Sequence, residues 1–247
     1  MSAMNTMLEY FQNRQLKNGK PRHEIHSCPE LTECIGAVGF LPLLESGIPG
    51  FSADALMAEE CRYRVLPDGS WEWPLWKWKG PVISEGNCVY GKFFAGKAGF
   101  VSLDWWPDLC NWRRSVYPLD AEKDDAGAVA EIILDTLREH GSMVSRDLRA
   151  ACGLVGPKMR SLFDGYVTRL QMACRIVTED FVYPRDKHGR EYGWGLSLLT
   201  TPERLLGGES LSVLKGRTPE ESHRRMKEHL QRLLPDATEK QILKILK

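Results

Sequence analysis

The sequence has no long hydrophobic run. Its apolar stretches are well short of the roughly 18 residues that a membrane-spanning helix needs, and its first residues, MSAMNTMLEYFQNRQ, lack the basic-then-apolar order of a secretory signal. We therefore expect neither a membrane-spanning nor a secreted protein. With 247 residues, 43% of them hydrophobic and 27% charged, the chain can bury one large core or several small ones. We expect a soluble, cytoplasmic protein without a membrane partner.

The sequence also has no excess of charge and no cysteine pattern. Its 33 Lys and Arg residues balance 33 Asp and Glu residues, so any affinity for nucleic acid has to come from local patches of charge. The 7 cysteines are scattered, with no CxxC pair and no density typical of a disulfide framework. We expect them to be reduced and buried.

Cofactor and catalytic motifs are absent as well. Gly96 and Lys97 are followed by Ala98, whereas a phosphate-binding loop needs GxxxxGK[ST]. His23 and His26 are three positions apart, whereas a zinc protease needs its histidines four apart on a helix. No Ser-His-Asp or Cys-His set stands out. We therefore expect no cofactor and no metal site.

Three helical patterns follow one another in the second half of the chain. The first, 126–141, repeats apolar residues at the spacing of one helix face and ends at Gly141. The second is short, and Ser145 is suited to cap its start. The third starts near Pro157. Its apolar side carries Met159, Leu162, Phe163, Tyr166 and Leu170.

The third helix also has a polar side, and a hairpin follows it. The polar side carries Lys158, Ser161, Thr168, Arg169 and Gln171, which are residue types that contact phosphates and base edges in a major groove. Strand-like runs then flank DKHGRE, in which Gly189 suits the positive φ of a tight turn. The hairpin tip carries Arg185, Lys187, His188 and Arg190.

Three helices and a charged hairpin are typical of a winged helix, so we expect DNA as a partner. The alternative is a purely structural or protein-docking module. It stays open because residues 126–200 hold 10 Lys and Arg residues against 9 Asp and Glu residues.

Tryptophan is concentrated in one region, since seven of the 8 tryptophans lie between residues 71 and 112. Trp71 and Trp73, and Trp76 and Trp78, are each two positions apart, which predicts an edge strand or irregular ribbon interrupted by Pro74. If exposed, these rings can stack on bases, with Lys77, Lys79, Arg113 and Arg114 on the backbone. If buried, they form a large core, and we favour this interpretation.

The C-terminal segment contains a strongly patterned helix. Thr218, Pro219 and Glu221 form a capping box at its start. Its apolar stripe consists of Met226, Leu230, Leu233 and Leu234, and its basic side of Arg224, Arg225, Lys227 and Arg232. We expect a docked helix with a solvated basic face; a phosphate-contacting arm and a docking surface for a protein partner are the alternatives.

Taken in order, the patterns predict four regions. Residues 1–61 form an N-terminal helical region, with a helix ending at Gly19, one between Pro29 and Gly39, and one capped by Ser52. Residues 62–120 form a Trp-rich central region packed on it, 121–200 a winged-helix domain and 201–247 a C-terminal helical tail. The expected fold class is α+β, mainly helical, with a winged helix-turn-helix module and a C-terminal helical appendage.

Two segments resemble the AlkZ-like DNA glycosylases. VYGKFFAGKAGFVSLDWWPDLCNWRR is similar to a family segment in its order of an aromatic residue, small apolar residues, an acidic-Trp-Pro step and a Trp-Arg pair. The matching residues here are Tyr90, Ala98, Asp104, Trp106-Pro107 and Trp112-Arg113. Residues 142–199 look like a DNA-binding module of that family. The resemblance implies tandem winged helices and excision of alkylated or crosslinked bases from DNA.

The sequence departs from this family where its chemistry is expected. Pro42 and Leu44 stand where the family has its glutamine-based motif, and Gly96 stands where it has a histidine. Glu45, Glu72 and Asp104 are the remaining candidates for a catalytic carboxylate, because glycosidic cleavage needs a nearby anion or an activated water.

Three functions follow from these patterns. We expect a DNA-binding protein related to AlkZ-like glycosylases that recognises damaged or distorted DNA. The alternatives are an active glycosylase with a displaced carboxylate and a protein-interaction scaffold.

Overall fold

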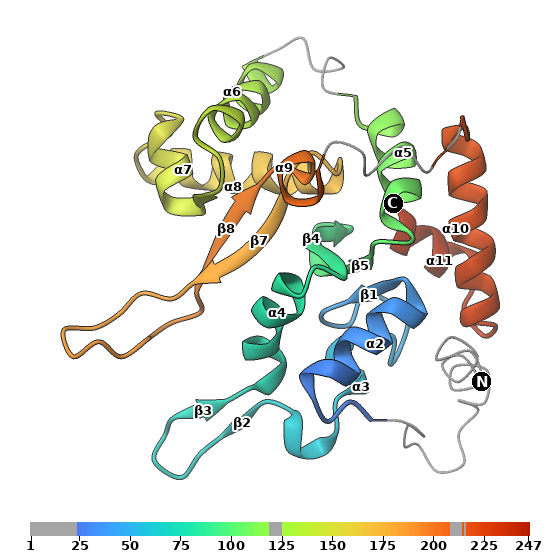
Figure 1. The fold of residues 1–247 in the computed structure, drawn as a ribbon, viewed down its shortest axis with the longest axis horizontal. Helices are drawn as coiled ribbons and strands as arrows, with labels where there is room; N and C mark the ends of the chain where they lie inside the picture. Colours follow the sequence, from blue (N-terminus) through green and yellow to red (C-terminus); the bar gives the residue numbers. More distant parts are fainter. Residues whose placement is uncertain (1–23, 119–124, 208–213, 215) are drawn as a thin grey trace.

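The computed structural model describes residues 24–118, 125–207, 214 and 216–247 (Figure 1). The helix predicted to end at Gly19, and His23, lie outside these residues. The described chain is α+β, and its main sheet has six antiparallel strands in the order β1-β5-β4-β7-β8-β6. The strands are β1 Phe40–Pro42, β4 Cys88–Phe94, β5 Lys97–Ser102, β6 Met143–Val144, β7 Val177–Val182 and β8 Leu196–Thr200.

The N-terminal helices begin and end where the sequence places their caps. Helix α2, Cys28–Val38, has Pro29 in its first turn and Gly39 at its C-cap with φ 78°. A Cβ on Gly39 would lie 2.4 Å from the Trp105 ring, so both the backbone angle and the close packing require glycine. Ser52 caps α3, Ala53–Leu56, as predicted. A 3-10 turn, η1 (Glu59–Cys61), follows.

The Trp-rich region differs from its prediction. Strands β2, Arg64–Val65, and β3, Trp71–Glu72, form a small separate hairpin. The next residues form a helix, α4 (Pro74–Ser84), so the prediction that Trp76 and Trp78 lie on a strand or ribbon is wrong. Pro74 does not interrupt a strand there; it occupies the first turn of the helix, where its fixed φ is favourable. Helix α5, Trp106–Val116, completes this region.

Residues 125–200 contain three helices followed by a hairpin, in the order that the sequence predicts. The helices are α6 Asp125–His140, α7 Ser145–Ala151 and α8 Pro157–Met172, and β7 and β8 form the hairpin. Strand β6, between α6 and α7, pairs with β8. Ser145 is the first residue of α7 and not its cap, because Val144 holds the cap position. A separate core formed by Ile133, Leu137, Leu148, Phe163 and Leu199, among others, holds these elements together.

The chain has a second, larger hydrophobic core, which includes residues of α2, β4 and β5. The C-terminal helices pack into this larger core and are not an appendage. They are α9 Pro202–Leu206, α10 Pro219–Leu233 and α11 Glu239–Leu246, and α10 lies along α5 (Figure 1). The capping box of Thr218 and Glu221 is present. Met226, Leu230, Leu233 and Leu234 are buried in the same core as residues of α2 and β4. The apolar stripe is therefore covered within the fold, as expected for a docked helix. A protein partner at the exposed side of these helices stays an alternative.

One buried arginine connects three parts of the fold. Arg113 on α5 is fully buried, and its guanidinium donates hydrogen bonds to the carbonyl oxygens of Phe93, Met172 and Leu246. It thereby ties β4, the end of α8 and the end of α11 together.

All 7 cysteines are free, and five of them are buried while Cys28 and Cys152 are half-buried. Among the described residues, no helix combines the length and the apolar character needed to span a membrane.

Candidate nucleic-acid interface

The outward side of α8 carries some of the predicted contact residues. Lys158, Ser161 and Arg169 are exposed there. Leu162, which we placed on the apolar side, is 40% exposed on this same surface. The buried side of the helix is formed instead by Phe163, Val167 and Leu170.

The remaining two predicted residues of α8 hold the helix against β4. Gln171 is only 3% exposed; its Oε1 accepts from the Lys92 backbone N–H at 3.1 Å, and its Nε2 donates to Thr178 Oγ1. Thr168 Oγ1 donates to the Asp164 carbonyl and accepts from Lys92 Nζ at 3.1 Å. Gln171 is therefore an internal residue, and its assignment as a DNA contact is wrong.

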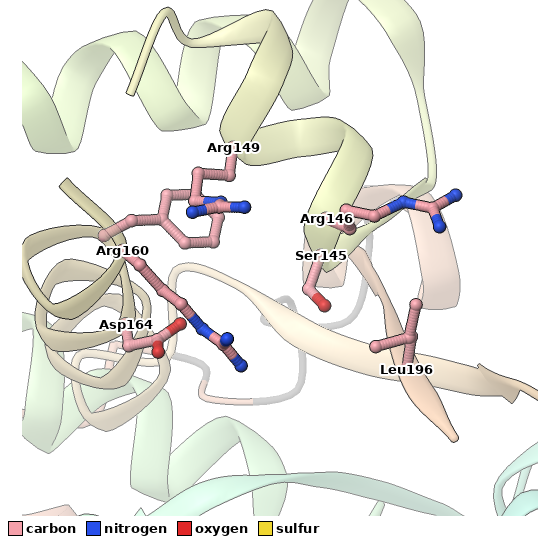
Figure 2. A pocket seen from close by; sticks show the side chains of 7 residues that line it. Ser145, Arg146, Arg149, Arg160, Asp164 and Leu196 are labelled. Atoms are coloured by element: carbon pink, nitrogen blue, oxygen red, sulfur yellow. The ribbon is translucent and has the colours of Figure 1, made fainter. Parts of the chain in front are cut away.

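A cavity of about 210 Å³ lies between α7, α8 and the start of β8 (Figure 2). Three arginines line it: Arg146 and Arg149 from α7, and Arg160 from α8. Figure 2 shows Arg146 toward the Leu196 side of the cavity and Arg149 and Arg160 toward α8. Asp164 is the only acidic residue in the lining. In a protein of zero net charge, this is a local concentration of positive charge suited to an anion.

These three arginines were not among the residues predicted from the sequence. Arg146 and Arg149 are three positions apart on one short helix, and Arg160 lies in the first turn of the next helix. The spacing of Arg146 and Arg149 was a signal that they share a face. Their meeting with Arg160 depends on how α7 packs on α8, which no local pattern records.

The tip of the β7–β8 hairpin is a turn with exposed basic side chains. Gly189 has φ 79°, as predicted for the turn. Arg185 and Arg190 make exposed ion pairs with Glu191 at 3.3 Å and Asp186 at 3.1 Å. The backbone N–H of Arg190 is the main cause of the lowered pKa of Asp186. Exposed pairs of this kind are weak, so both arginines can exchange their partners for phosphate. Lys187 and His188 are exposed beside them.

The tryptophans are neither a closed core nor an open platform. Trp71, Trp73, Trp76 and Trp78 are all half-buried. Trp73 stacks on Trp76 with ring centroids 5.3 Å apart. Trp194, at the base of the β7–β8 hairpin, stacks on Trp71 at 4.8 Å, and its carbonyl accepts from Trp76 Nε1. The eighth tryptophan thus joins the two hairpins, a contact that sequence reasoning missed.

Of the four basic side chains expected to contact a nucleic-acid backbone near these rings, only one is exposed to a ligand. Lys77 is exposed, whereas Arg113 is fully buried and Arg114 bonds the Cys174 carbonyl and Glu203. Lys79 is 1% exposed, with its Nζ 3.0 Å from the centroid of the Trp76 ring and 3.5 Å from that of Phe181. Burial lowers the pKa of Lys79 to about 7.

A larger pocket, of about 720 Å³, lies between the two hairpins. The β2–β3 side supplies Gly69, Ser70 and Trp71, and α4 supplies Trp76 and Lys77. The β7–β8 side supplies Tyr183, Glu191, Tyr192 and Gly193. We call it the hairpin–tryptophan pocket.

The three candidate carboxylates are exposed or half-buried and lie apart. Glu45 follows β1 and its backbone carbonyl accepts from Lys97, whereas Glu72 on β3 pairs with Arg64. Pairing of Phe40 with Val101 and of Pro42 with Gly99 places Glu45 and Asp104 beyond opposite ends of the β1–β5 pair. Within the described residues, no group of three or more His, Cys, Asp or Glu residues could hold a metal ion.

The positions that depart from the glycosylase motif offer no polar side chain for catalysis. Pro42 is buried in β1, and Leu44 is 45% exposed without a polar group to offer. Gly96 has φ 80° in the turn between β4 and β5, a backbone angle that disfavours histidine.

Comparison with known proteins extends the resemblance seen in the sequence. No curated protein and no solved structure matches this chain. The family described as AlkZ related matches residues 25–247, which is far more than the two segments that carried the resemblance. The match spans the larger hydrophobic core, the arginine-lined cavity, both hairpins and the C-terminal helices. The chain belongs to the AlkZ-related family.

Proposed function

We propose that residues 125–200 form a winged helix and that the protein uses it to bind duplex DNA. The order of α6, β6, α7, α8 and the β7–β8 hairpin supports this assignment, as does the pairing of β6 with β8. Membership of the AlkZ-related family supports DNA as the partner. In this proposal the outward side of α8 enters the major groove and the hairpin is the wing.

The observation that carries the proposal is the arginine-lined cavity beside α8. Its three arginines outnumber the single aspartate of the lining, so positive charge is concentrated beside the first turn of α8. Arg146 is paired only with the exposed Asp147 beside it, at 3.0 Å. Phosphate groups of a duplex lying along α8 would replace such weak partners, and each neutralised phosphate releases about one counterion.

The test is a titration of duplex DNA at several salt concentrations. Replacing Arg149 and Arg160 by Ala lowers affinity and reduces the salt slope by about two if each contacts one phosphate. Arg138→Ala is the matched control, because Arg138 is an exposed helix arginine on α6 paired with Asp135. An unchanged slope in the double variant would remove the cavity from the interface.

The preferred DNA in this proposal is damaged or distorted. Half-buried tryptophans next to the wing favour a ligand with accessible base faces over a regular duplex alone. The wing itself, through Lys187 and Arg190, positions the protein on the backbone and reads no sequence. A cytoplasmic location is part of the same proposal.

Base excision is the second candidate function, and family membership is the observation in its favour. It requires a carboxylate beside the bound sugar, and Glu45, Glu72 and Asp104 are separate in the fold. Binding without excision is therefore the better supported of the two.

A further inference from the structure

The hairpin–tryptophan pocket has the size and lining of a ligand site. Its volume of about 720 Å³ falls within the range of pockets that hold molecules of nucleotide size. Four aromatic side chains line it: Trp71, Trp76, Tyr183 and Tyr192. It lies between two hairpins far apart in the sequence, one of which is the proposed wing.

Exposed aromatic rings gather at this pocket. Tyr63, Tyr192 and Trp194 are 51%, 58% and 53% exposed. Tyr63 lies against Trp71, with ring centroids 6.3 Å apart, and Trp71 stacks on Trp194. Tyr63, Trp71 and Trp194 therefore form one continuous group, and Tyr192 lines the same pocket as Trp71. Exposed rings gathered in this way mark an interaction surface.

The charged residues at the pocket favour a polyanion. Lys77 lies in its lining, and the wing tip beyond it carries Lys187, His188 and Arg190. Glu191 is the one carboxylate in the lining, and its Oε1 already accepts from Arg185. A ligand with stacked rings and phosphates matches this surface, whereas an acidic or purely apolar peptide matches only one part of it.

We propose that the hairpin–tryptophan pocket binds unpaired nucleotides of a DNA strand that leaves the duplex held by the proposed wing. Paired bases are stacked on one another and cannot lie on protein rings, so the bases in the pocket must be unpaired. The protein therefore binds a junction between duplex and single strand more tightly than a blunt duplex. This inference rests on the proposed DNA binding by α8 and the wing.

Tyr192 is the residue on which to test it. More than half of the side chain is exposed, so substitution leaves both cores intact. Tyr192→Leu removes the ring, whereas Tyr192→Phe keeps the stacking surface and serves as the matched control. Affinities are measured at one salt concentration for a blunt duplex, for the same duplex with a single-stranded extension of about six nucleotides on either end, and for the single strand alone.

The wild-type protein and Tyr192→Phe are expected to bind an extended duplex about fivefold or more tighter than the blunt one, because one stacked base contributes about that factor. Tyr192→Leu loses this preference and keeps its affinity for the blunt duplex. Equal affinity of the wild type for blunt and extended duplexes would overturn the inference and leave the exposed rings to a protein partner. The same preference in Tyr192→Leu would overturn it too.

The design separates this inference from the proposed function. Binding to blunt duplex without any gain from the extension contradicts the pocket alone. Binding to the single strand that depends on Tyr192, without affinity for blunt duplex, supports the pocket and contradicts duplex binding by α8 and the wing.

Discussion

Trp194 at the base of the β7–β8 hairpin stacks on Trp71 of the β2–β3 hairpin, with ring centroids 4.8 Å apart and planes inclined by 22°. The Trp194 carbonyl also accepts a hydrogen bond from Trp76 on α4. The proposed wing is therefore anchored on the Trp-rich region at its base, while its basic tip remains exposed. An anchored wing presents its charges in one place, which lowers the entropy lost on binding.

The first prediction concerns this contact. Trp71→Ala and Trp194→Ala are each expected to destabilise the protein, and the double variant to lose about 1 kcal/mol less than the sum, because a stacked pair contributes about 0.5–1.5 kcal/mol beyond its buried area. Chemical denaturation of the four proteins measures the coupling. Strictly additive effects would mean that the rings touch without stabilising the wing.

The second prediction concerns the pH dependence of stability set by Lys79. Its pKa is lowered by burial from 10.5 to about 7 in the folded protein, so between these values the unfolded chain holds a proton that the folded one lacks. The free energy of unfolding therefore rises with pH between about pH 7 and 10.5. Below pH 7 the folded protein bears the full cost of burying the charged amine. Lys79→Met is expected to stabilise the protein at neutral pH by more than about 1 kcal/mol, and the gain to shrink toward pH 10.

Denaturation at two pH values checks this prediction, and Lys77→Met is the control because Lys77 is exposed on the same helix. A gain for Lys79→Met that is the same at both values would show that the lysine titrates normally. A loss of stability at neutral pH would show that its contacts with Trp76 and Phe181 outweigh its burial.

The third prediction concerns the wing tip. Reversing the charges of Lys187 and Arg190 to Glu is expected to lower affinity for all duplex sequences alike, because the tip contacts the backbone or the minor groove beside it. Titration of several unrelated duplexes gives the comparison. If one sequence alone lost affinity, the wing would be reading bases.

The fourth prediction concerns catalysis. Pro42 and Leu44 can neither orient water nor stabilise positive charge on a sugar, and general-base help alone typically supplies about 10²–10⁴-fold. The purified protein is therefore expected to release no alkylated base above the spontaneous rate. Release that disappears in Glu45→Gln would establish the glycosylase. Release that persists after substitution of Glu45, Glu72 and Asp104 would place the catalytic site elsewhere.

Local signals in the sequence were reliable guides to the fold. Ser52, Gly141 and the capping box of Thr218 and Glu221 act through residues within one helical turn, so their roles can be read without knowing the packing. The same holds for Gly189 in its turn.

Packing decided the features that the sequence did not predict. The spacing of Trp76 and Trp78 fits a strand, yet Pro74 starts a helix that buries Leu75, Val82 and Ile83. The sequence of α10 indicates that one face is apolar, but it does not indicate which elements cover that face. The contact of Trp194 with Trp76 joins residues 118 positions apart.

Packing also decided which residues form the candidate interface. The polar side of α8 was predicted as one surface, but its flank at Thr168 and Gln171 faces Lys92 of β4, and only the register between the helix and the sheet determines that. Arg149 and Arg160 come together for a similar reason. Residue type therefore indicated the kind of ligand, and tertiary packing selected the residues.

The central claim is that the module of α6 to β8 holds the DNA, and hydrogen–deuterium exchange with and without a saturating duplex tests it most directly. We predict slower exchange at the start of α8 and α7 and along the wing from residue 183 to 195, with no change in α10 and α11. Protection confined to residues 218–247, or bound DNA that leaves α7, α8 and the wing unchanged, would contradict the account.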